Sequence, residues 1–187
     1  SINKYESTQS TSSVYKYEYT QSIGKEFDGI LRYLINQTRN NIHDNGTIEI
    51  TTNSMYDENY HPKCLVDYQD KGKFYYSNNI CESWICFDFK NMSIMLSSYS
   101  IKSYFSGPNT GHLKNWVIEA SNDKKNWNII DRRTDDSSLN GSNIAKVFFV
   151  NQPRNEFYRF IQLRQTGYCW FNNYRIYFQL IEFFGNL

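Results

Sequence analysis

Three segments of the sequence carry side chains suited to holding a ligand: residues 54–61 (SMYDENYH), 75–83 (YYSNNICES) and 103–112 (SYFSGPNTGH). Each segment places aromatic rings beside amide or imidazole groups in a stretch that reads as a loop. Rings stack on ligands, while amides and imidazoles donate and accept hydrogen bonds. The combination is typical of non-covalent binding sites, although 16 tyrosines in the chain would place some of them in loops by chance.

The chain has no sequence pattern typical of an active site. It lacks a glycine-rich phosphate loop, a Gly-x-Ser-x-Gly turn and a His-Glu-x-x-His motif. Its three histidines, His43, His61 and His112, lie in loop-like segments without an evident base or orienting partner. We therefore expect a protein that is not an enzyme. The alternative is a cleft in which His61 or His112 meets Asp57 or Asp70.

A metal site is the other chemistry to weigh. His61, Cys64, Cys81 and Cys86 follow a spacing that tetrahedral zinc sites tolerate. However, Cys86 lies within an apolar strand pattern, and cysteine is often buried simply as a small hydrophobic residue. We therefore expect no metal and no cofactor. A chain of this length does not need disulfides to fold, so the four cysteines are expected to be free thiols.

Charge and hydropathy limit the kinds of partner. The net charge is +1 and the basic residues are scattered, which argues against nucleic acid and anionic membranes. No apolar run approaches the roughly 20 residues of a membrane helix, and the first residues do not resemble a signal peptide. These features favour a cytoplasmic protein without membrane insertion.

Two elements are expected before the first regular strand. Residues 1–22 form a polar arm whose tyrosines either lie along a neighbouring surface as a strand or belong to a partly disordered terminus. Residues 23–46 are expected to hold an amphipathic helix packed on the domain's own core, because apolar residues recur on one helix face. These residues are Phe27, Ile30, Leu31, Leu34 and Ile35.

Residues 47–187 change to the period of two that is typical of β-strands. Strands are predicted at 47–52, 65–68, 73–77, 83–90, 93–104, 115–122, 126–131, 144–150, 157–165 and 175–185. Turn-rich links separate them and no second helical pattern appears, which predicts an all-β sandwich or barrel. Asp88 lies inside one apolar strand and needs a partner, for which Arg159 on another strand is the candidate.

These strands resemble the discoidin, or coagulation factor V/VIII type C, domain family over about residues 47–187. The matching stretches are SWICFDF, YSIKSY, WVIEASNDKKNW, FYRFIQLRQTG and LIEFFG. The resemblance implies an antiparallel jelly-roll β-sandwich of the galactose-binding-domain-like type, in which Trp116 and Trp127 are core residues. The helix and EITTNS are similar to what precedes the domain in intracellular relatives, and no cysteine follows Gly185 where secreted relatives close a disulfide.

Members of this family are generally binding modules for galactosides and other glycans, anionic lipid, collagen or partner proteins. The resemblance places their ligand loops on the three segments named above. The implied ligand-binding residues are Tyr56, Tyr60, His61, Asn78, Asn79, Tyr104, Phe105, Asn109 and His112. Trp170 is expected to plug the end of the sandwich. Some relatives hold a structural calcium where Asp67 and Glu182 stand here, and a purely hydrogen-bonded loop is the alternative.

The favoured interpretation is a non-catalytic module that binds another protein or forms part of a larger intracellular assembly. The alternative is a carbohydrate-binding module of lectin type that holds galactosides. A lectin site needs a concave pocket with a stacking ring, whereas a protein interface needs a broader patch with central aromatic anchors.

Overall fold

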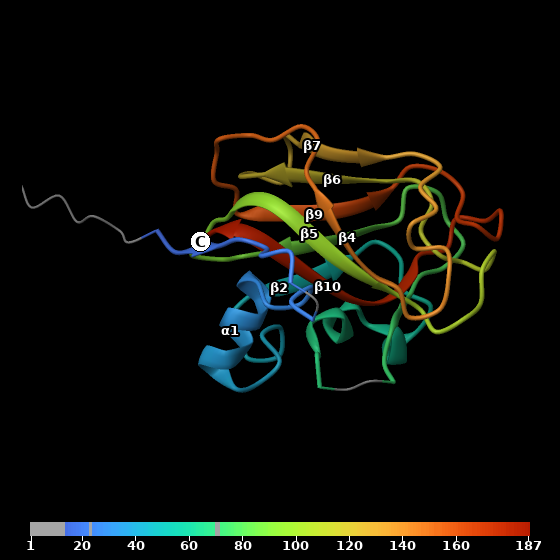
Figure 1. The fold of residues 1–187 in the computed structure, drawn as a ribbon, viewed down its shortest axis with the longest axis horizontal. Helices are drawn as coiled ribbons and strands as arrows, with labels where there is room; N and C mark the ends of the chain where they lie inside the picture. Colours follow the sequence, from blue (N-terminus) through green and yellow to red (C-terminus); the bar gives the residue numbers. More distant parts are fainter. Residues whose placement is uncertain (1–13, 23, 70–71) are drawn as a thin grey trace, which may run out of the picture.

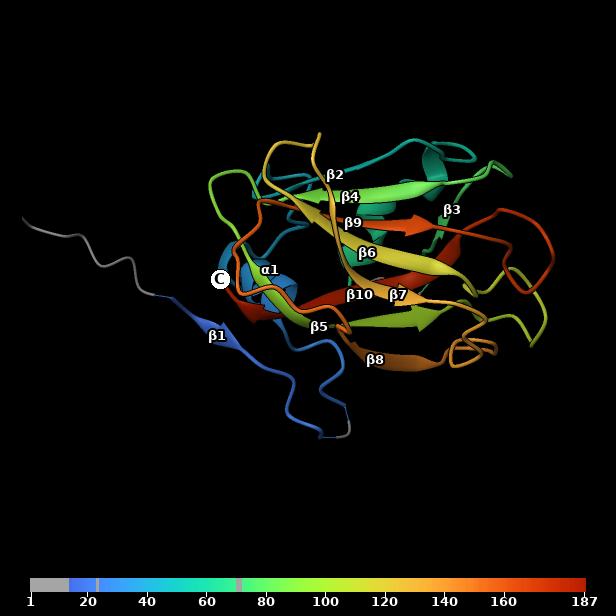
Figure 2. The same cartoon turned by 90° about the horizontal axis from the view of Figure 1, so that it is seen from above.

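Two antiparallel β-sheets face each other in the computed structural model, which describes residues 14–22, 24–69 and 72–187 (Figures 1 and 2). The first sheet has the order β1-β10-β5-β8, with β3 also paired to β10. Its strands are β1 (Lys16–Tyr17), β10 (Tyr177–Asn186), β5 (Met95–Ser103), β8 (Ala145–Phe149) and β3 (Tyr75–Tyr76). The second sheet has the order β2-β4-β9-β6-β7. Its strands are β2 (Glu49–Thr52), β4 (Trp84–Asp88), β9 (Phe160–Gln165), β6 (Trp116–Ser121) and β7 (Asn128–Arg133).

The core lies between the sheets, where alternate residues of each strand point inward. Ile85 and Phe87 of β4 are completely buried, and the ring of Phe87 meets that of Phe183 on β10 edge-on at 5.1 Å between centroids. Trp116 is also completely buried and donates from Nε1 to the Tyr99 hydroxyl at 2.9 Å. The predicted all-β antiparallel sandwich is therefore confirmed, and so is the core position of Trp116.

Trp127 departs from its expected core position. The residue lies just before β7, an edge strand, and is only half-buried. Its Nε1 donates to the Lys124 carbonyl at 3.2 Å, so the ring closes the hairpin turn instead of entering the core.

One predicted strand is wrong. Residues 65–68 do not form a strand, because Pro62–Val66 forms the 3-10 helix η2. Pro62 occupies its first turn, and the His61 side chain accepts the Lys63 N–H at 3.0 Å as an N-terminal cap. A second 3-10 turn, η1 (Glu58–Tyr60), precedes it and is capped by Asp57, whose Oδ1 accepts from Asn59 N at 2.8 Å. Capping therefore outweighs the apolar pattern in this segment.

The predicted amphipathic helix is present as α1 (Ile30–Thr38), with Ile30, Leu31 and Leu34 buried. The helix is shorter than the apolar pattern predicts, because a side chain from a distant strand fixes where it begins. The buried carboxylate of Glu182 on β10 accepts the N–H groups of Gly29, Leu31 and Arg32 at 2.8–3.1 Å. These are the unpaired donors of a helix N-terminus, which attracts negative charge. Phe27 lies before the helix, where its ring meets Tyr68 at 5.8 Å.

The described part of the arm runs along the edge of the first sheet as β1. Lys16 and Tyr17 pair with Asn186 and Gly185 of β10. The Tyr17 ring packs on Tyr33 of α1 at 4.8 Å between centroids. The arm therefore adopts the strand alternative over these residues, while residues 1–13 of the predicted arm lie outside the described part of the chain.

The ion pair expected for Asp88 is confirmed. Arg159 donates from Nε and Nη2 to the two carboxylate oxygens at 2.7 and 2.9 Å. The Lys90 N–H donates to Asp88 Oδ1 at 2.7 Å. The pair joins the end of β4 to the residue before β9 on the second sheet.

Candidate functional site

The connections after β5, β7 and β9 and the segments before β3 and β4 gather at one end of the sandwich (Figure 1, right). Helix α1 and the C-terminus lie toward the other end. Three contacts tie these segments together: Tyr56 packs on Tyr76, and Phe74 packs on both Tyr60 and Tyr104. The three predicted ligand segments are therefore neighbours in space. We call this region the loop end.

A concave aromatic surface lies at the loop end. Its lining consists of Tyr60, Phe74, Tyr76, Tyr104 and Tyr177, which enclose about 230 Å³. Successive rings touch at centroid distances of 4.3 Å between Phe74 and Tyr104 and 5.6 Å between Tyr76 and Tyr177. We call this surface the aromatic hollow. Its size is below the roughly 300–1,000 Å³ of sites for drug-sized ligands, so it suits one small unit of a ligand.

The sheet fixes the floor of the aromatic hollow. Tyr76 and Tyr177 are directly paired residues of β3 and β10. The Tyr177 hydroxyl accepts the Gly111 N–H, and a Cβ at Gly111 would lie 1.8 Å from the Tyr177 ring. Only glycine allows this approach, so the loop after β5 rests directly on the floor. Tyr60 and Tyr104 form loop-borne walls.

One cation lies beside the aromatic hollow. The Arg175 guanidinium stacks over Tyr76 at 4.9 Å and over Tyr56 at 5.6 Å, and it donates to the Ser77 carbonyl at 3.1 Å. Burial raises the pKa of both Tyr76 and Tyr104 above the usual value. Their hydroxyls therefore stay neutral at ordinary pH and are able to donate as well as accept hydrogen bonds.

Four of the predicted ligand residues meet at the aromatic hollow. Tyr60 and Tyr104 line it. Tyr56 lies at the rim, where its ring centroid is 5.9 Å from that of Tyr60. Phe105 packs on Tyr104 at 3.9 Å and is 52% exposed. The predicted rings are therefore brought together by the fold.

The predicted amides stand around the aromatic hollow and mainly brace loops. Asn78 Nδ2 donates to the Met55 carbonyl at 2.8 Å. Asn79 Oδ1 accepts from Tyr174 N at 2.8 Å. Asn109 has a left-handed backbone and exchanges hydrogen bonds with Asn140. All three predicted residues remain exposed at the surface.

The two predicted histidines do not lie at the aromatic hollow. His112 is buried, and its Nε2 lies 3.2 and 3.0 Å from the carbonyls of Ser106 and Gly107, so it supports the loop from inside. His61 faces His43 at 5.0 Å between ring centroids and caps η2. Both rings therefore support loops that carry aromatic residues. The buried ring of His112 is not open to a ligand, which corrects that prediction, while a ligand contact of the half-buried His61 stays a prediction.

Four residues at the site escaped the sequence analysis: Phe74, Tyr76, Tyr177 and Arg175. Phe74 and Tyr76 lie in the predicted strand 73–77, and Arg175 and Tyr177 at the start of the last strand. A signal existed, because alternate residues at the open end of a strand point away from the buried face. Tyr76 belongs to segment 75–83 without being named among the predicted ligand residues, and Arg175 and Tyr177 fall in a strand predicted as framework.

Another exposed aromatic group comes from the loop after β9. Tyr168 and Phe171 are 49% and 65% exposed. Trp170, expected as a plug, is half-buried under Lys114, whose Nζ lies 4.7 Å from the ring centroid, and its Nε1 donates to the Asp136 carbonyl. Trp170 thus joins two loops at the sandwich end.

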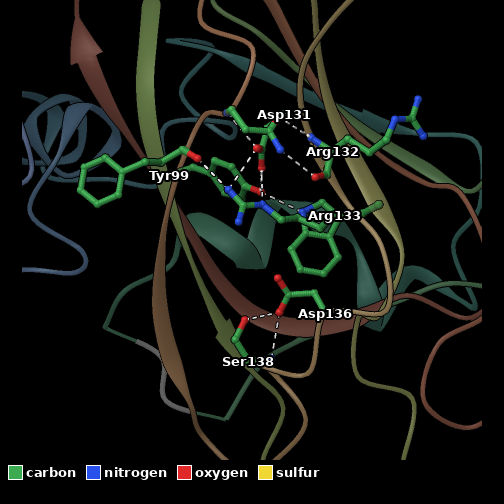
Figure 3. Close-up of polar contacts among 9 residues, drawn as sticks. Tyr99, Asp131, Arg132, Arg133, Asp136 and Ser138 are labelled. Carbon is green, nitrogen blue, oxygen red and sulfur yellow. Dashed lines mark hydrogen bonds and ion pairs between the residues drawn. The ribbon is translucent and has the colours of Figure 1, made fainter.

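A buried polar network lies beneath the loop after β7 (Figure 3). The carboxylate of Asp131 accepts from the Tyr99 hydroxyl at 2.5 Å and from Nε and Nη2 of Arg133 at 2.8 and 3.0 Å. Farther along, Asp136 accepts from Ser138 N at 2.9 Å. Asp131 is completely buried, so its carboxylate anchors β7 to β5 and does not face solvent.

The alternative of a catalytic cleft finds no support in these residues. Asp57 caps η1 while His112 is enclosed by its own loop, and His61 faces His43. Asp70 lies outside the described residues.

Two of the residues considered as metal ligands, Glu182 and Asp67, contact groups of the protein itself. Both oxygens of Glu182 accept backbone N–H groups at the start of α1, and the Asp67 carboxylate lies 4.0 Å from Lys73 Nζ. Cys81 is exposed, while Cys64 and Cys86 are buried, and none of the four cysteines forms a disulfide bond. Within the part of the chain that the structure describes, no three His, Cys, Asp or Glu side chains are grouped to hold a metal ion.

No family model matches the sequence, but solved structures do. A CBM32 module from Clostridium perfringens in complex with GalNAc-β-1,3-galactose has a TM-score of 0.57 at 14% identity, covering 74% of this chain and 96% of that one. The family 32 CBM from C. perfringens NanJ in complex with galactose has a TM-score of 0.57 at 12% identity, covering 74% and 93%. A fucolectin from striped bass (Morone saxatilis) has a TM-score of 0.57 at 12% identity, covering 75% and 46%.

The chain has the galactose-binding-like fold. The fold implied by the resemblance to the discoidin family is therefore confirmed, whereas its intracellular branch stays a prediction. At 12–14% identity the likeness of this galactose-binding-like sandwich to its neighbours concerns the fold alone. Among the described residues, α1 and the 3-10 turns are too short or too polar to cross a bilayer.

Proposed function

We propose that this chain is a non-catalytic carbohydrate-binding module, and that the aromatic hollow holds one neutral sugar residue of a glycan. The observation that carries the proposal is the hollow itself: five rings around about 230 Å³, with a floor on two paired strands. A pyranose offers a flat C–H face to stack on a ring and hydroxyls that need partners at its edge. The hollow supplies both kinds of contact.

The polar groups of the aromatic hollow suit a neutral ligand. The hydroxyls of Tyr60, Tyr76 and Tyr104 either donate to or accept from sugar hydroxyls, and Arg175 adds a donor beside them. In the part of the chain that the structure describes, the lining contains neither a carboxylate nor a histidine. These side chains therefore orient a ligand without taking or giving a proton.

Two of the similar structures support galactosides as the first ligands to test. One is in complex with GalNAc-β-1,3-galactose and the other with galactose. The proposal for this chain rests on its own hollow, and the neighbours supply only the choice of sugar.

A glycan array followed by calorimetry with the selected sugar tests the proposal. The test variant is Tyr104→Ala, because Tyr104 packs against Phe74 and Tyr177 in the wall of the hollow. The control is Tyr168→Ala, an exposed ring on another loop of the same end. We expect saturable binding by the wild type, a loss of about tenfold or more in Tyr104→Ala, corresponding to about 1.4 kcal/mol, and little change in the control. Both variants must melt like the wild type. A blank array, or equal binding by Tyr104→Ala, would overturn the proposal.

Binding of another protein, within a larger intracellular assembly, is the second candidate. The observation in its favour is the number of large apolar side chains exposed around the same end. These are Tyr56, Ile80, Phe105, Tyr168 and Phe171, each at least 42% exposed. Such patches mark interaction surfaces, and aromatic residues are favoured as their anchors.

A pull-down from cytoplasmic extract separates the two candidates. The variant Tyr168→Ser/Phe171→Ser removes two exposed rings that neither line the hollow nor pack on its walls. A defined protein retained by the wild type and lost by this variant, together with a blank glycan array, would favour the protein interface. Unchanged glycan binding by the same variant would favour the aromatic hollow.

A further inference from the structure

A second and larger cavity lies on the flank of the molecule, between α1 and residues 66–69. Its volume is about 670 Å³, within the range of ligand sites. It shares no lining residue with the aromatic hollow. We call it the flank groove, and its chemistry differs from that of the hollow.

One face of α1 forms a wall of the flank groove. Arg32 and Asn36 stand at i and i+4, which places them on one side of the helix, and Arg39 follows as its left-handed C-cap residue. Seven residues at the helical rise span about 10 Å, so the Cα atoms of the two arginines lie about that far apart along the axis, with an amide between them. The opposite wall contributes Tyr68 and Gln69.

Arg32 is held in position. Its Nε donates to the Phe27 carbonyl at 3.2 Å, and its guanidinium lies 4.4 Å from the centroid of the Tyr68 ring. Tyr68 is in turn fixed by its hydroxyl, which donates to the Ile181 carbonyl at 2.6 Å. A guanidinium that is already oriented loses less entropy when it binds a planar carboxylate.

The flank groove carries an excess of positive charge. Among the residues that the structure describes, neither Arg32 nor Arg39 forms an ion pair with a carboxylate. Asp67 also lines the groove, and its carboxylate lies 4.0 Å from Lys73 Nζ. An anionic ligand therefore meets two arginines and one carboxylate.

We propose that the flank groove binds an acidic saccharide, a short glycan that carries uronate carboxylates. The arginines match the carboxylates in bidentate geometry, and the amides of Asn36 and Gln69 match sugar hydroxyls because amides both donate and accept. An acidic peptide fits less well. Among the described lining residues, only Ile35 and Val66 offer aliphatic contact for side-chain anchors, and none belongs to a sheet edge.

Calorimetric titration of the full chain at low salt tests this assignment with three probes: trigalacturonic acid, neutral galactotriose and a hexaglutamate peptide. The variant is Arg39→Glu, since Arg39 is exposed and its side chain takes no part in the core. The matched control is Arg132→Glu, the same charge change at an exposed arginine on β7. We expect trigalacturonic acid to bind the wild type and the control equally, and Arg39→Glu to lose at least tenfold. Galactotriose should show no binding that depends on Arg39.

Three results would overturn the assignment. If trigalacturonic acid does not bind, the flank groove is not an acidic-saccharide site. If Arg39→Glu and Arg132→Glu lose affinity equally, the binding is general charge attraction and not recognition by the groove. Tighter binding of hexaglutamate than of trigalacturonic acid, with the same dependence on Arg39, would make the groove a peptide site. The variant Tyr104→Ala distinguishes this proposal from that for the aromatic hollow, because it should leave trigalacturonic acid binding unchanged.

Discussion

Removing the carboxylate of Asp88 should destabilise the sandwich by a measurable and bounded amount. The side chain of Asp88 is 5% exposed, and it accepts two hydrogen bonds from Arg159 and one from Lys90 N. The Arg159 side chain is 43% exposed, so in Asp88→Ala its guanidinium regains water and the ion pair contributes only about 1 kcal/mol. The bond from Lys90 N–H adds about 1.5 kcal/mol. The expected loss is therefore about 2 to 3 kcal/mol.

The loss of stability is measured by chemical and thermal unfolding of Asp88→Ala, Arg159→Ala and the double variant. For a chain of this size the loss corresponds to a decrease in Tm of about 5–10 °C. Arg159→Ala should cost at least as much as Asp88→Ala, because it leaves the less exposed charge without its main partner. The double variant should cost less than the sum of the two. An unchanged Tm in Asp88→Ala, or strictly additive losses, would refute the reasoning.

The pair also predicts a response to acid. Burial raises the pKa of Asp88, but the hydrogen bonds from Arg159 and Lys90 outweigh this and hold the pKa below its usual value. A depressed folded-state pKa contributes stability above the unfolded-state pKa of about 3.9, and that stability is lost as pH falls through the folded-state value. The stability difference between wild type and Asp88→Ala should therefore shrink below about pH 4.

Two further predictions concern buried groups. Complete burial raises the pKa of Glu182 to about 7, against four backbone N–H donors that lower it. A raised folded-state pKa gives stability that is full below about pH 4.5 and is lost as pH rises through 7, so urea unfolding should show up to about 3 kcal/mol less stability at pH 8 from this group. Glu182→Gln should remove the part of the pH dependence of stability that comes from Glu182 and leave the part that comes from His43 and His61. An identical pH dependence in the variant would contradict this prediction. DTNB should modify one thiol of the native chain, Cys81, and four after denaturation, since Cys86 and the other thiols are buried; four fast reactions in the native chain would contradict the fold around them.

Much of the architecture was predictable because it follows from patterns that act locally. Alternation placed Ile85 and Phe87 inward, and the cost of burying a lone carboxylate required a partner for Asp88. The start of α1 was not predictable in this way. It depends on Glu182, which follows the helix by about 150 residues and reaches it only in the folded chain.

The candidate site was predictable at the level of loops and less so at the level of atoms. Loops rich in rings do meet at one end, and Tyr60 and Tyr104 line the hollow. Which side chains face outward depends on turns that the pattern does not reveal. His112 points inward because its ring lies against loop carbonyls, and Tyr177 reaches the surface only because Gly111 has no Cβ.

The pairing of β1 with β10 places the two described chain ends side by side. Tyr15 and Leu187 exchange both backbone hydrogen bonds, at 2.9 and 2.8 Å, far from the loop end (Figure 1). Labels or surface tethers attached after Leu187 would therefore present both the aromatic hollow and its surrounding rings outward, in one orientation. A short linker that joins residues 187 and 14 would close the chain into a ring, and cutting that ring at an exposed turn would give a circular permutant with the same two sheets.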